Sequence, residues 1–206
     1  MAKSIDAYGL KPHILTRQNI LIVYTSPMKI HGNGQAKILT PSEMDKLFTK
    51  GLTTSRDRAL FAIMRYTACR CSEALALTTD DIQGEVVTFR KATTKGKLAT
   101  RSVELHPKLA QILREYDPAP GLLFPGRNGH LDRVTADLIL REACKRSHLK
   151  GVSTHSFRHS ALTEMSNAGV PLRVIQEISG HKSLASLQQY LEVTHEHKKA
   201  AIACLK

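Results

Sequence analysis

The sequence predicts an α+β fold that is mainly helical, with one small antiparallel β-sheet or hairpin. Thr40-Pro-Ser-Glu43 has the pattern of a helix start, with a proline in the first turn and a glutamate placed to bond back to the cap. Residues 55–69 carry apolar side chains at helical spacing. Residues 85–90 and 100–105 have the composition of strands, and the polar stretch between them is typical of a hairpin tip.

The composition indicates a globular protein with a polyanionic partner. The chain has 206 residues, 42% of them hydrophobic, which is enough for the core of one large domain or two small ones. Thirty Lys and Arg against eighteen Asp and Glu give a net charge of +12. This balance favours nucleic acid above all, with an anionic membrane surface as the weaker alternative.

No segment has the features of a membrane span or a secretion signal. No apolar run approaches the roughly 20 residues that a membrane helix needs, and residues 1–13 lack the apolar core of a signal peptide. The four cysteines show no C-x-x-C pairing, so we expect reduced thiols and neither a disulfide framework nor a zinc site. The expected location is the cytoplasm, with nucleoid association if the source is prokaryotic.

Residues 1–37 are expected to form a basic arm and linker. Five Lys or Arg stand there against a single acid, Asp6, and the stretch contains Pro27 and a Gly-rich breaker. A short β-type run at residues 20–24 is either a strand that docks on the main domain or a remnant of a preceding element. The main domain is expected over residues 38–206, with a C-terminal tail from about residue 194.

The helix at residues 55–69 leads directly into Arg70. Glu73, three residues later, lies within ion-pair reach and is expected to hold the orientation of the guanidinium, although a simple surface ion pair is the alternative. The hairpin that follows carries Lys95 and Lys97 at its basic tip and Arg101 in its second strand. A solvated tip without chemistry is the alternative there.

Further helices are expected at residues 106–115 and 132–147. After them, His155 and Arg158 lie three apart, so on a helix they share one face and can reach the same anion. Gly169-Val-Pro171 predicts a turn and a helix restart.

Two more candidate residues close this stretch. A predicted helix end at residues 179–181 carries His181, and a helix at residues 183–190 carries Tyr190. The plain alternatives are a capping role for His181 and half-buried packing for Tyr190.

Together these segments resemble the tyrosine recombinase (phage integrase) family. Residues 67–77 are similar to its pattern T-G-x-R-x-S-E-x-x-x-L, with Ala68 where glycine is usual. Residues 95–105 are similar to K-x-G-K…R-x-V-P-L. The C-terminal stretch resembles H-x-x-R, then L-G-H, then a tyrosine nine residues after that histidine, which is the distance from His181 to Tyr190. The resemblance covers about residues 38–193.

The resemblance implies an integrase-like catalytic domain and a set of site residues. The catalytic residues would be Arg70, Lys95, His155, Arg158, His181 and Tyr190. Glu73 and His159 are expected to support them, and Lys97 and Arg101 to contact DNA. Lys95 fits the catalytic lysine of the family hairpin better than Lys97. Members of the family usually carry a DNA-clamping domain as well, for which residues 1–37 are too few.

The chemistry of a DNA phosphodiester fits these residue types. Arg70 and Arg158 offer permanently charged, planar forks for phosphate oxygens, and the two histidines add hydrogen-bond donors. Cationic neighbours lower the pKa of a tyrosine from about 10 and favour the nucleophilic phenolate of Tyr190. Lys95 would protonate the leaving 5′-hydroxyl, as the resemblance implies. The sequence has no P-loop, H-E-x-x-H or clustered catalytic carboxylates, so no metal and no cofactor are expected.

The expected function is site-specific DNA recombination, in which duplex DNA is cleaved and rejoined through a 3′-phosphotyrosyl intermediate during integration, excision, inversion or resolution. Three alternatives stay open: a type IB topoisomerase-like nicking and closing enzyme, a non-catalytic DNA-binding accessory protein, and a metallo-nuclease that uses His155, His159, His195 and His197.

The expected partners are double-stranded DNA, further copies of the chain in a tetrameric synapse, and accessory DNA-bending proteins, with no membrane. The apolar end of the tail, residues 200–205, is too short to be stable alone. It is expected to fold back on its own domain or to insert into a neighbouring protomer.

Overall fold

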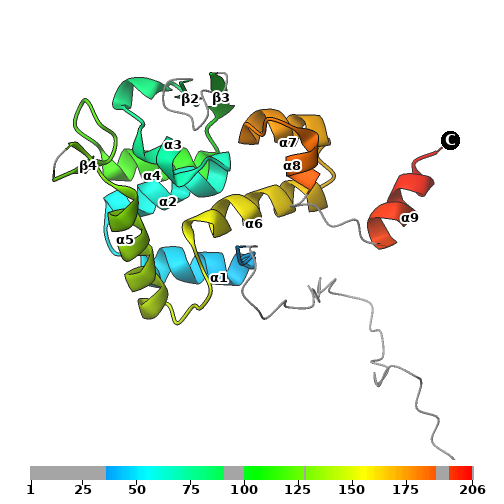
Figure 1. Ribbon diagram of the computed structural model, residues 1–206, viewed down its shortest axis with the longest axis horizontal. Coiled ribbons are helices and arrows are strands. Elements are labelled where there is room, and N and C mark those ends of the chain that lie inside the picture. The colour runs from blue at the N-terminus through cyan, green and yellow to red at the C-terminus, as the bar shows by residue number, and fades with distance from the viewer. Residues whose placement is uncertain (1–35, 91–99, 128, 189–194, 206) are drawn as a thin grey trace, which may run out of the picture. The chain divides into compact units, whose positions relative to one another are not determined.

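The computed structural model describes residues 36–90, 100–127, 129–188 and 195–205 (Figure 1). Its α-helices are α1 Pro41–Lys46, α2 Ser55–Thr67, α3 Cys71–Leu75, α4 Pro107–Tyr116, α5 Arg133–Arg146, α6 Thr154–Asn167, α7 Leu172–Ser179, α8 Leu184–Gln188 and α9 His195–Ala203. The π-helix η1 Leu47–Gly51 and the 3-10 helix η2 Thr79–Asp81 add one turn each. The strands are β1 Ile82–Gln83, β2 Val86–Phe89, β3 Arg101–Glu104, β4 Pro125–Gly126 and β5 Gly129–His130.

Local caps place the first helices where the sequence predicts them. At α1 the Glu43 N–H donates to Thr40 Oγ1 and the Thr40 N–H donates to Glu43 Oε2, which completes the predicted capping box. Thr54 caps α2, and the chain leaves α2 through Ala68 at a φ of +51°. An alanine is strained in this left-handed region, whereas a glycine adopts it freely.

Helix α2 lies at the centre of the main hydrophobic core. Its Leu60, Phe61 and Ile63 are fully buried, and the helix packs against α3, α4 and α6. The Phe61 ring stacks on the ring of Phe157 in α6, with centroids 5.0 Å apart. Because α2 leads into Arg70 and α6 carries the H-x-x-R stretch, this packing fixes the two regions relative to each other.

A three-stranded antiparallel sheet in the order β1-β2-β3 contains the predicted hairpin. Val87 pairs with Val103, and Phe89 pairs with Arg101. Strand β1 has two residues, too few for a recognisable alternation in the sequence. The hairpin tip, which holds Lys95 and Lys97, lies outside the described residues.

A second, smaller hydrophobic cluster joins α6, α7 and α8 to the end of α2. It consists of Ala68, Ala161, Leu162, Ile175 and Leu187. Helix α7 follows Pro171 and ends at the predicted place, where Gly180 adopts a left-handed φ of +66°.

The predicted mainly helical fold with a small antiparallel sheet is confirmed. The expected helices at residues 106–115 and 132–147 are α4 and α5, with ends shifted by one residue. Cys69, Cys71 and Cys144 are buried free thiols, and Cys204 is exposed. Within the described ranges, no helix is long and apolar enough to cross a membrane. Nearly all of the predicted arm, residues 1–37, falls outside those ranges.

Candidate active site

Arg70 stands at the start of α3, where Glu73 holds it. The Arg70 backbone N–H donates to Glu73 Oε2 at 2.8 Å, and Nη1 donates to Oε1 at 3.2 Å. The Glu73 side chain is fully buried, whereas 28% of the Arg70 side chain is exposed. The predicted ion pair is therefore present, and it orients a guanidinium that an external anion can still reach.

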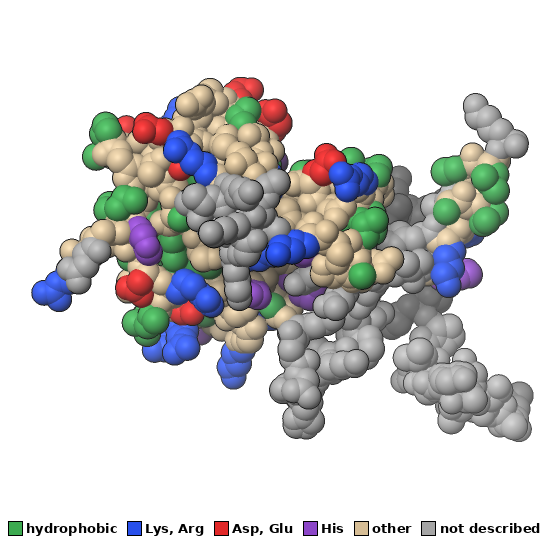
Figure 2. Space-filling model, turned by 45° about the horizontal axis from the view of Figure 1, so that its top comes forward, with side chains coloured by type: hydrophobic (Ala, Val, Ile, Leu, Met, Phe, Trp, Pro, Cys, Tyr) green, Lys and Arg blue, Asp and Glu red, His purple; other side chains and the backbone are tan. Residues whose placement is uncertain are grey.

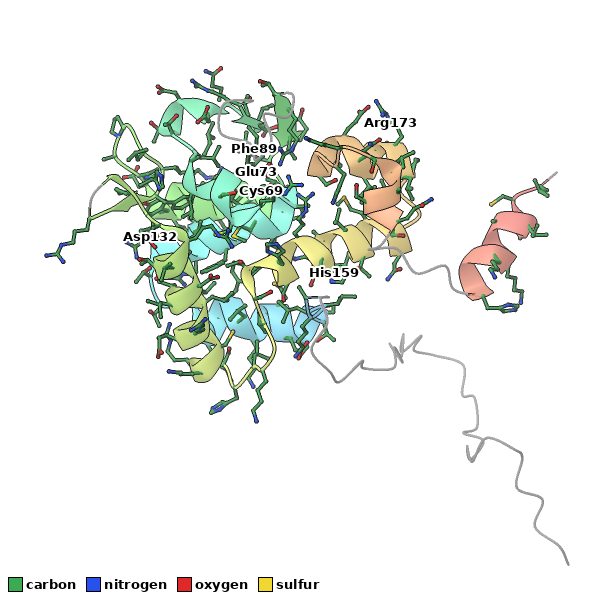
Figure 3. All side chains as sticks on the ribbon, in the orientation of Figure 1. Cys69, Glu73, Phe89, Asp132, His159 and Arg173 are labelled. Carbon is green, nitrogen blue, oxygen red and sulfur yellow. The ribbon has the colours of Figure 1, made fainter. Side chains whose placement is uncertain are left out.

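Arg101, which was expected to contact DNA, makes several contacts inside the protein. Its guanidinium donates to both carboxylate oxygens of Glu73, at 3.0 and 3.4 Å, and its Nε donates to the Ile178 carbonyl at 3.0 Å. It also lies over the Phe89 ring, 4.3 Å from the centroid. Only 9% of the side chain is exposed, so Arg101 joins β3 to α3 and α7 from inside the protein. Figure 3 shows the labelled Glu73 and Phe89 close together at this junction.

The Glu73 carboxylate is the negative centre of this group. Burial alone would raise the pKa of Glu73, but the hydrogen bond and charge of Arg101, with the N–H and charge of Arg70, lower it below its usual value. Glu73 therefore stays ionised and neutralises one of the arginine charges around it.

Arg158 lies in α6 and is almost fully buried. Its Nη1 donates to the carbonyls of Ala68 and Ser179, the latter at 2.9 Å. Its Nη2 lies 3.0 Å from Nε2 and 3.1 Å from Nδ1 of His181. Burial, and then the charge of Arg70, lower the pKa of Arg158 to about 10, so this side chain is still cationic at neutral pH.

His181 follows the left-handed end of α7. The Gln176 side-chain amide donates to the His181 carbonyl at 3.1 Å, and the Ser179 hydroxyl lies 2.7 Å from His181 Nδ1. Burial, followed by the charges of Arg158, Arg70 and Arg101, lowers the pKa of His181 to about 3. The imidazole is therefore neutral at pH 7.

The two histidines of α6 have different surroundings. His155 is exposed at the surface. Its ring is nevertheless partly desolvated by its neighbours, and this desolvation, together with the charges of Arg133, Arg158 and Arg70, lowers its pKa. His159 was expected to support the active site, but it is buried on another side of α6, with Nδ1 2.6 Å from the Ala36 carbonyl. Figure 3 shows the labelled His159 on the part of α6 toward α1.

These contacts assemble a cationic cluster from four segments: Glu73 of α3 with Arg70 directly before it, Arg101 of β3, Arg158 of α6 and His181 after α7. Three guanidinium charges against one carboxylate leave a local excess of two positive charges while His181 is neutral. Such a cluster can bind an anion and stabilise negative charge that develops on it. In the described part of the chain, no three His, Cys, Asp or Glu side chains are grouped so that they could hold a metal ion.

Three predicted residues lie outside the described residues: Lys95, Lys97 and Tyr190. The described chain resumes at residue 100, directly before β3, and α8 ends two residues before Tyr190. Sequence reasoning missed Ser179, which contacts both Arg158 and His181. The available signal was a departure from the family pattern L-G-H, because Ser179 stands at the leucine.

Comparisons with known proteins show which family the chain resembles. The model of the phage integrase family matches residues 37–197. The tyrosine recombinase XerD of Corynebacterium glutamicum is 33% identical over 150 residues, which cover 68% of this chain and 49% of XerD. The chain spans about half the length of the curated relatives it matches.

Solved structures show the same fold. The crystal structure of XerA recombinase superposes with a TM-score of 0.70 at 22% identity, over 84% of this chain and 66% of that one. The Tn1549 transposon integrase in complex with circular intermediate DNA gives a TM-score of 0.71 at 18% identity, over 84% of this chain and 68% of that one.

Proposed function

Because the chain belongs to the phage integrase family, we propose that it is a site-specific DNA recombinase that cleaves and rejoins duplex DNA through a 3′-phosphotyrosyl intermediate. The observation that carries the proposal is the convergence of Arg70 and Arg158 on one cluster anchored by Glu73. Arg158 bonds to the carbonyl of Ala68, 90 residues earlier in the chain. Two forked cations with fixed orientations suit a phosphodiester.

The proposed work of the cluster is to stabilise charge on the phosphoryl oxygens. Attack on a phosphodiester shifts negative charge onto these oxygens, and donors that are already oriented need no rearrangement at that moment. Glu73 orients Arg70, and the two carbonyls orient Arg158. His155, exposed beside them, supplies a further donor to the same phosphate.

Tyr190 and Lys95 complete the proposed reaction. The cationic cluster favours the phenolate of Tyr190, which attacks phosphorus and forms a 3′-phosphotyrosyl bond while the 5′-oxygen leaves. Lys95 donates the proton that the leaving 5′-oxygen needs. Rejoining reverses these steps with the 5′-hydroxyl of another strand. Lys97, beside Lys95 in the hairpin, is proposed to contact DNA.

Duplex DNA is the proposed substrate. The chain carries a net charge of +12, and Figure 2 shows Lys and Arg side chains on several elements of one face, with His side chains among them. The Tn1549 integrase was solved in complex with DNA. The names of the relatives are those of recombinases and integrases, and they lend no support to the nicking and closing alternative.

Assembly on DNA, with four protomers in a synapse, is part of the proposal. Ile202 in helix α9 and Leu205, two residues after its end, are 70% and 75% exposed. A helix of nine residues with an uncovered apolar end needs a docking surface. We assign that surface to a neighbouring protomer, which would couple assembly to cleavage. Accessory DNA-bending proteins and a cytoplasmic location remain predictions.

The test starts from a random pool, because the target sequence is unknown. A library of duplexes with randomised sequence and a nick near the centre is incubated with the protein in EDTA. Cleavage next to the nick releases a short fragment that carries the free 5′-hydroxyl. Because this fragment diffuses away, rejoining is prevented and the covalent protein–DNA complex is trapped. Protein–DNA complexes that survive detergent are isolated, sequenced and reselected, and we expect one sequence family to be enriched.

Tyr190→Phe is the matched control, since it removes only the phenolic oxygen. This variant should bind the selected duplex as the wild type does and form no detergent-resistant complex. Failure of the wild type to enrich any sequence, or a normal adduct from Tyr190→Phe, would contradict the proposed function.

A further inference from the structure

The Arg101 side chain has protein groups packed around its whole guanidinium. The guanidinium lies over the Phe89 ring and donates to both carboxylate oxygens of Glu73. Its Nε donates to the Ile178 carbonyl. Gly180 lies so close that a Cβ added there would be 3.0 Å from Arg101 Nη1 and 3.1 Å from Cζ and Nε. A residue without a side chain is therefore needed at position 180 to leave room for this guanidinium.

The contact with Glu73 fixes the carboxylate that orients Arg70. Glu73 Oε2 accepts from the Arg70 N–H at 2.8 Å and from Arg101 Nη2 at 3.0 Å. Oε1 accepts from Arg70 Nη1 at 3.2 Å and from Arg101 Nη1 at 3.4 Å. Because each oxygen has two donors, the carboxylate is held in one orientation, and this orientation directs the Arg70 fork. Arg101 is the inner of the two arginines, and Arg70 is the one that an external anion can reach.

The contact with Ile178 fixes the end of α7. The last carbonyls of a helix have no partner within the helix, and they attract cations. At α7 two arginines take two successive carbonyls, since Arg101 Nε bonds to Ile178 and Arg158 Nη1 bonds to Ser179. The Ser179 carbonyl is one of the groups that hold Arg158, so a shift of the end of α7 would move Arg158 as well.

Arg101 thus contacts the supports of both forked cations. Resting on the proposed function, we propose that Arg101 is a positioning residue that sets Arg70 and Arg158 at a fixed separation for one phosphate. It does so by joining Glu73 to the end of α7. A lysine cannot replace it, because one ammonium nitrogen cannot bond to both carboxylate oxygens, reach the Ile178 carbonyl and stack flat on an aromatic ring.

Arg65 offers a matched control. Like Arg101, it is largely buried, pairs with a carboxylate on another element and lies beside an aromatic ring. Its partners are Glu164 and Tyr66, which do not belong to the cluster. Arg65→Lys therefore removes a planar fork of the same kind at a place away from the proposed phosphate site.

Amide hydrogen exchange, measured by NMR, tests the anchoring of α7 without DNA. The Gly180 N–H donates to a carbonyl of α7, and the Gly169 N–H donates to a carbonyl of α6. In Arg101→Lys we expect Gly180 to exchange at least about 10-fold faster, the effect of losing a hydrogen bond to a charged group, and Gly169 to keep its wild-type rate. An unchanged Gly180 in Arg101→Lys, or an equal change of Gly180 in Arg65→Lys, would overturn the proposal.

Cleavage of the selected duplex tests the positioning role. At saturating DNA, Arg101→Lys should cleave about 10- to 100-fold more slowly, the range for a lost hydrogen bond to a charged group. Its DNA affinity should be unchanged, and Arg65→Lys should cleave normally. A wild-type rate in Arg101→Lys would refute positioning, and a loss of affinity at a normal rate would indicate a direct DNA contact instead. Should the wild type form no adduct, the proposed function fails, while amide exchange still decides the anchoring.

Two glycines separate the contact with Arg101 from a general loss of stability. Gly180 and Gly169 both follow helices at left-handed φ values, +66° and +74°, so alanine is strained to a similar degree at both. No described atom lies within 4 Å of a Cβ added at Gly169, whereas at Gly180 that Cβ meets the guanidinium.

We expect Gly180→Ala to slow cleavage as Arg101→Lys does, and Gly169→Ala to cleave normally. The two slow variants disturb the same contact, so the double variant should be no slower than Arg101→Lys alone. Normal cleavage by Gly180→Ala, or rate losses that multiply in the double variant, would contradict the proposed role of Arg101.

Discussion

At the scale of single residues, the arrangement of the cluster depends on the buried carboxylate of Glu73. It pairs with Arg70 and Arg101, and removal of one partner from a buried ion pair leaves the other charges uncompensated. The shared carboxylate thus explains how three guanidinium groups lie close together inside a folded protein.

Glu73→Gln should lower the free energy of unfolding at pH 7 by about 3 kcal/mol or more. The folded-state pKa of Glu73 is lowered, so its stabilising contribution is present above the unfolded value of about 4.3 and is lost as the pH falls through the folded value. The difference between wild type and variant should therefore shrink as the pH falls below the unfolded value, as measured by urea unfolding.

The control for this prediction is Glu164→Gln, which breaks the ion pair of Glu164 with Arg65 between α2 and α6. The Glu164 side chain is 40% exposed, so the loss should stay below about 1 kcal/mol. Equal losses in the two variants would argue against the central place of Glu73, and so would a loss in Glu73→Gln that does not shrink on acidification.

At the scale of elements, the turn between α2 and α3 holds an alanine in a strained left-handed backbone conformation that a glycine would adopt freely. Ala68 adopts a φ of +51°, and its carbonyl accepts from Arg158. Ala68→Gly should raise the free energy of unfolding by about 0.5 to 1 kcal/mol, because relief of a left-handed alanine exceeds the loss of one buried methyl group. Thermal and urea unfolding measure the change.

Asp117→Gly is the reference for that prediction. Asp117 also ends a helix at a positive φ, of +47°, but its side chain is exposed and loses little packing. The Asp117→Gly substitution should therefore raise the free energy of unfolding at least as much as Ala68→Gly. If Asp117→Gly stabilised the protein and Ala68→Gly destabilised it, packing of the Ala68 methyl would outweigh the strain.

The elements were predictable where their causes are local. The capping box at Thr40 and Glu43, the restart after Pro171 and the end at Gly180 lie within a few residues of the helix ends they set. The burial of Arg101 depends on Glu73, 28 residues away, and on Ile178, 77 residues away. No spacing rule in one sequence reveals such contacts, so the sequence alone does not place Arg101 beside Glu73.

At the scale of the whole molecule, the net charge of +12 should govern DNA affinity. Each phosphate that a Lys or Arg neutralises releases counterions, so binding weakens as salt rises. The Tyr190→Phe variant cannot form the covalent complex, so it reports equilibrium binding. We expect its affinity for the selected duplex to fall by about 10³-fold or more between 50 and 200 mM salt. A flat response in fluorescence anisotropy would contradict a broad phosphate-binding surface.

The central claim is that Tyr190 forms the covalent bond to DNA, and the most direct measurement is identification of the modified residue. The trapped complex is digested with nuclease and protease. The peptide that carries a nucleotide linked through its phosphate is sequenced by mass spectrometry. The account predicts a phosphodiester on Tyr190 through the 3′-oxygen of the nucleotide. A nucleotide on any other residue, or attached through its 5′-oxygen, would contradict it.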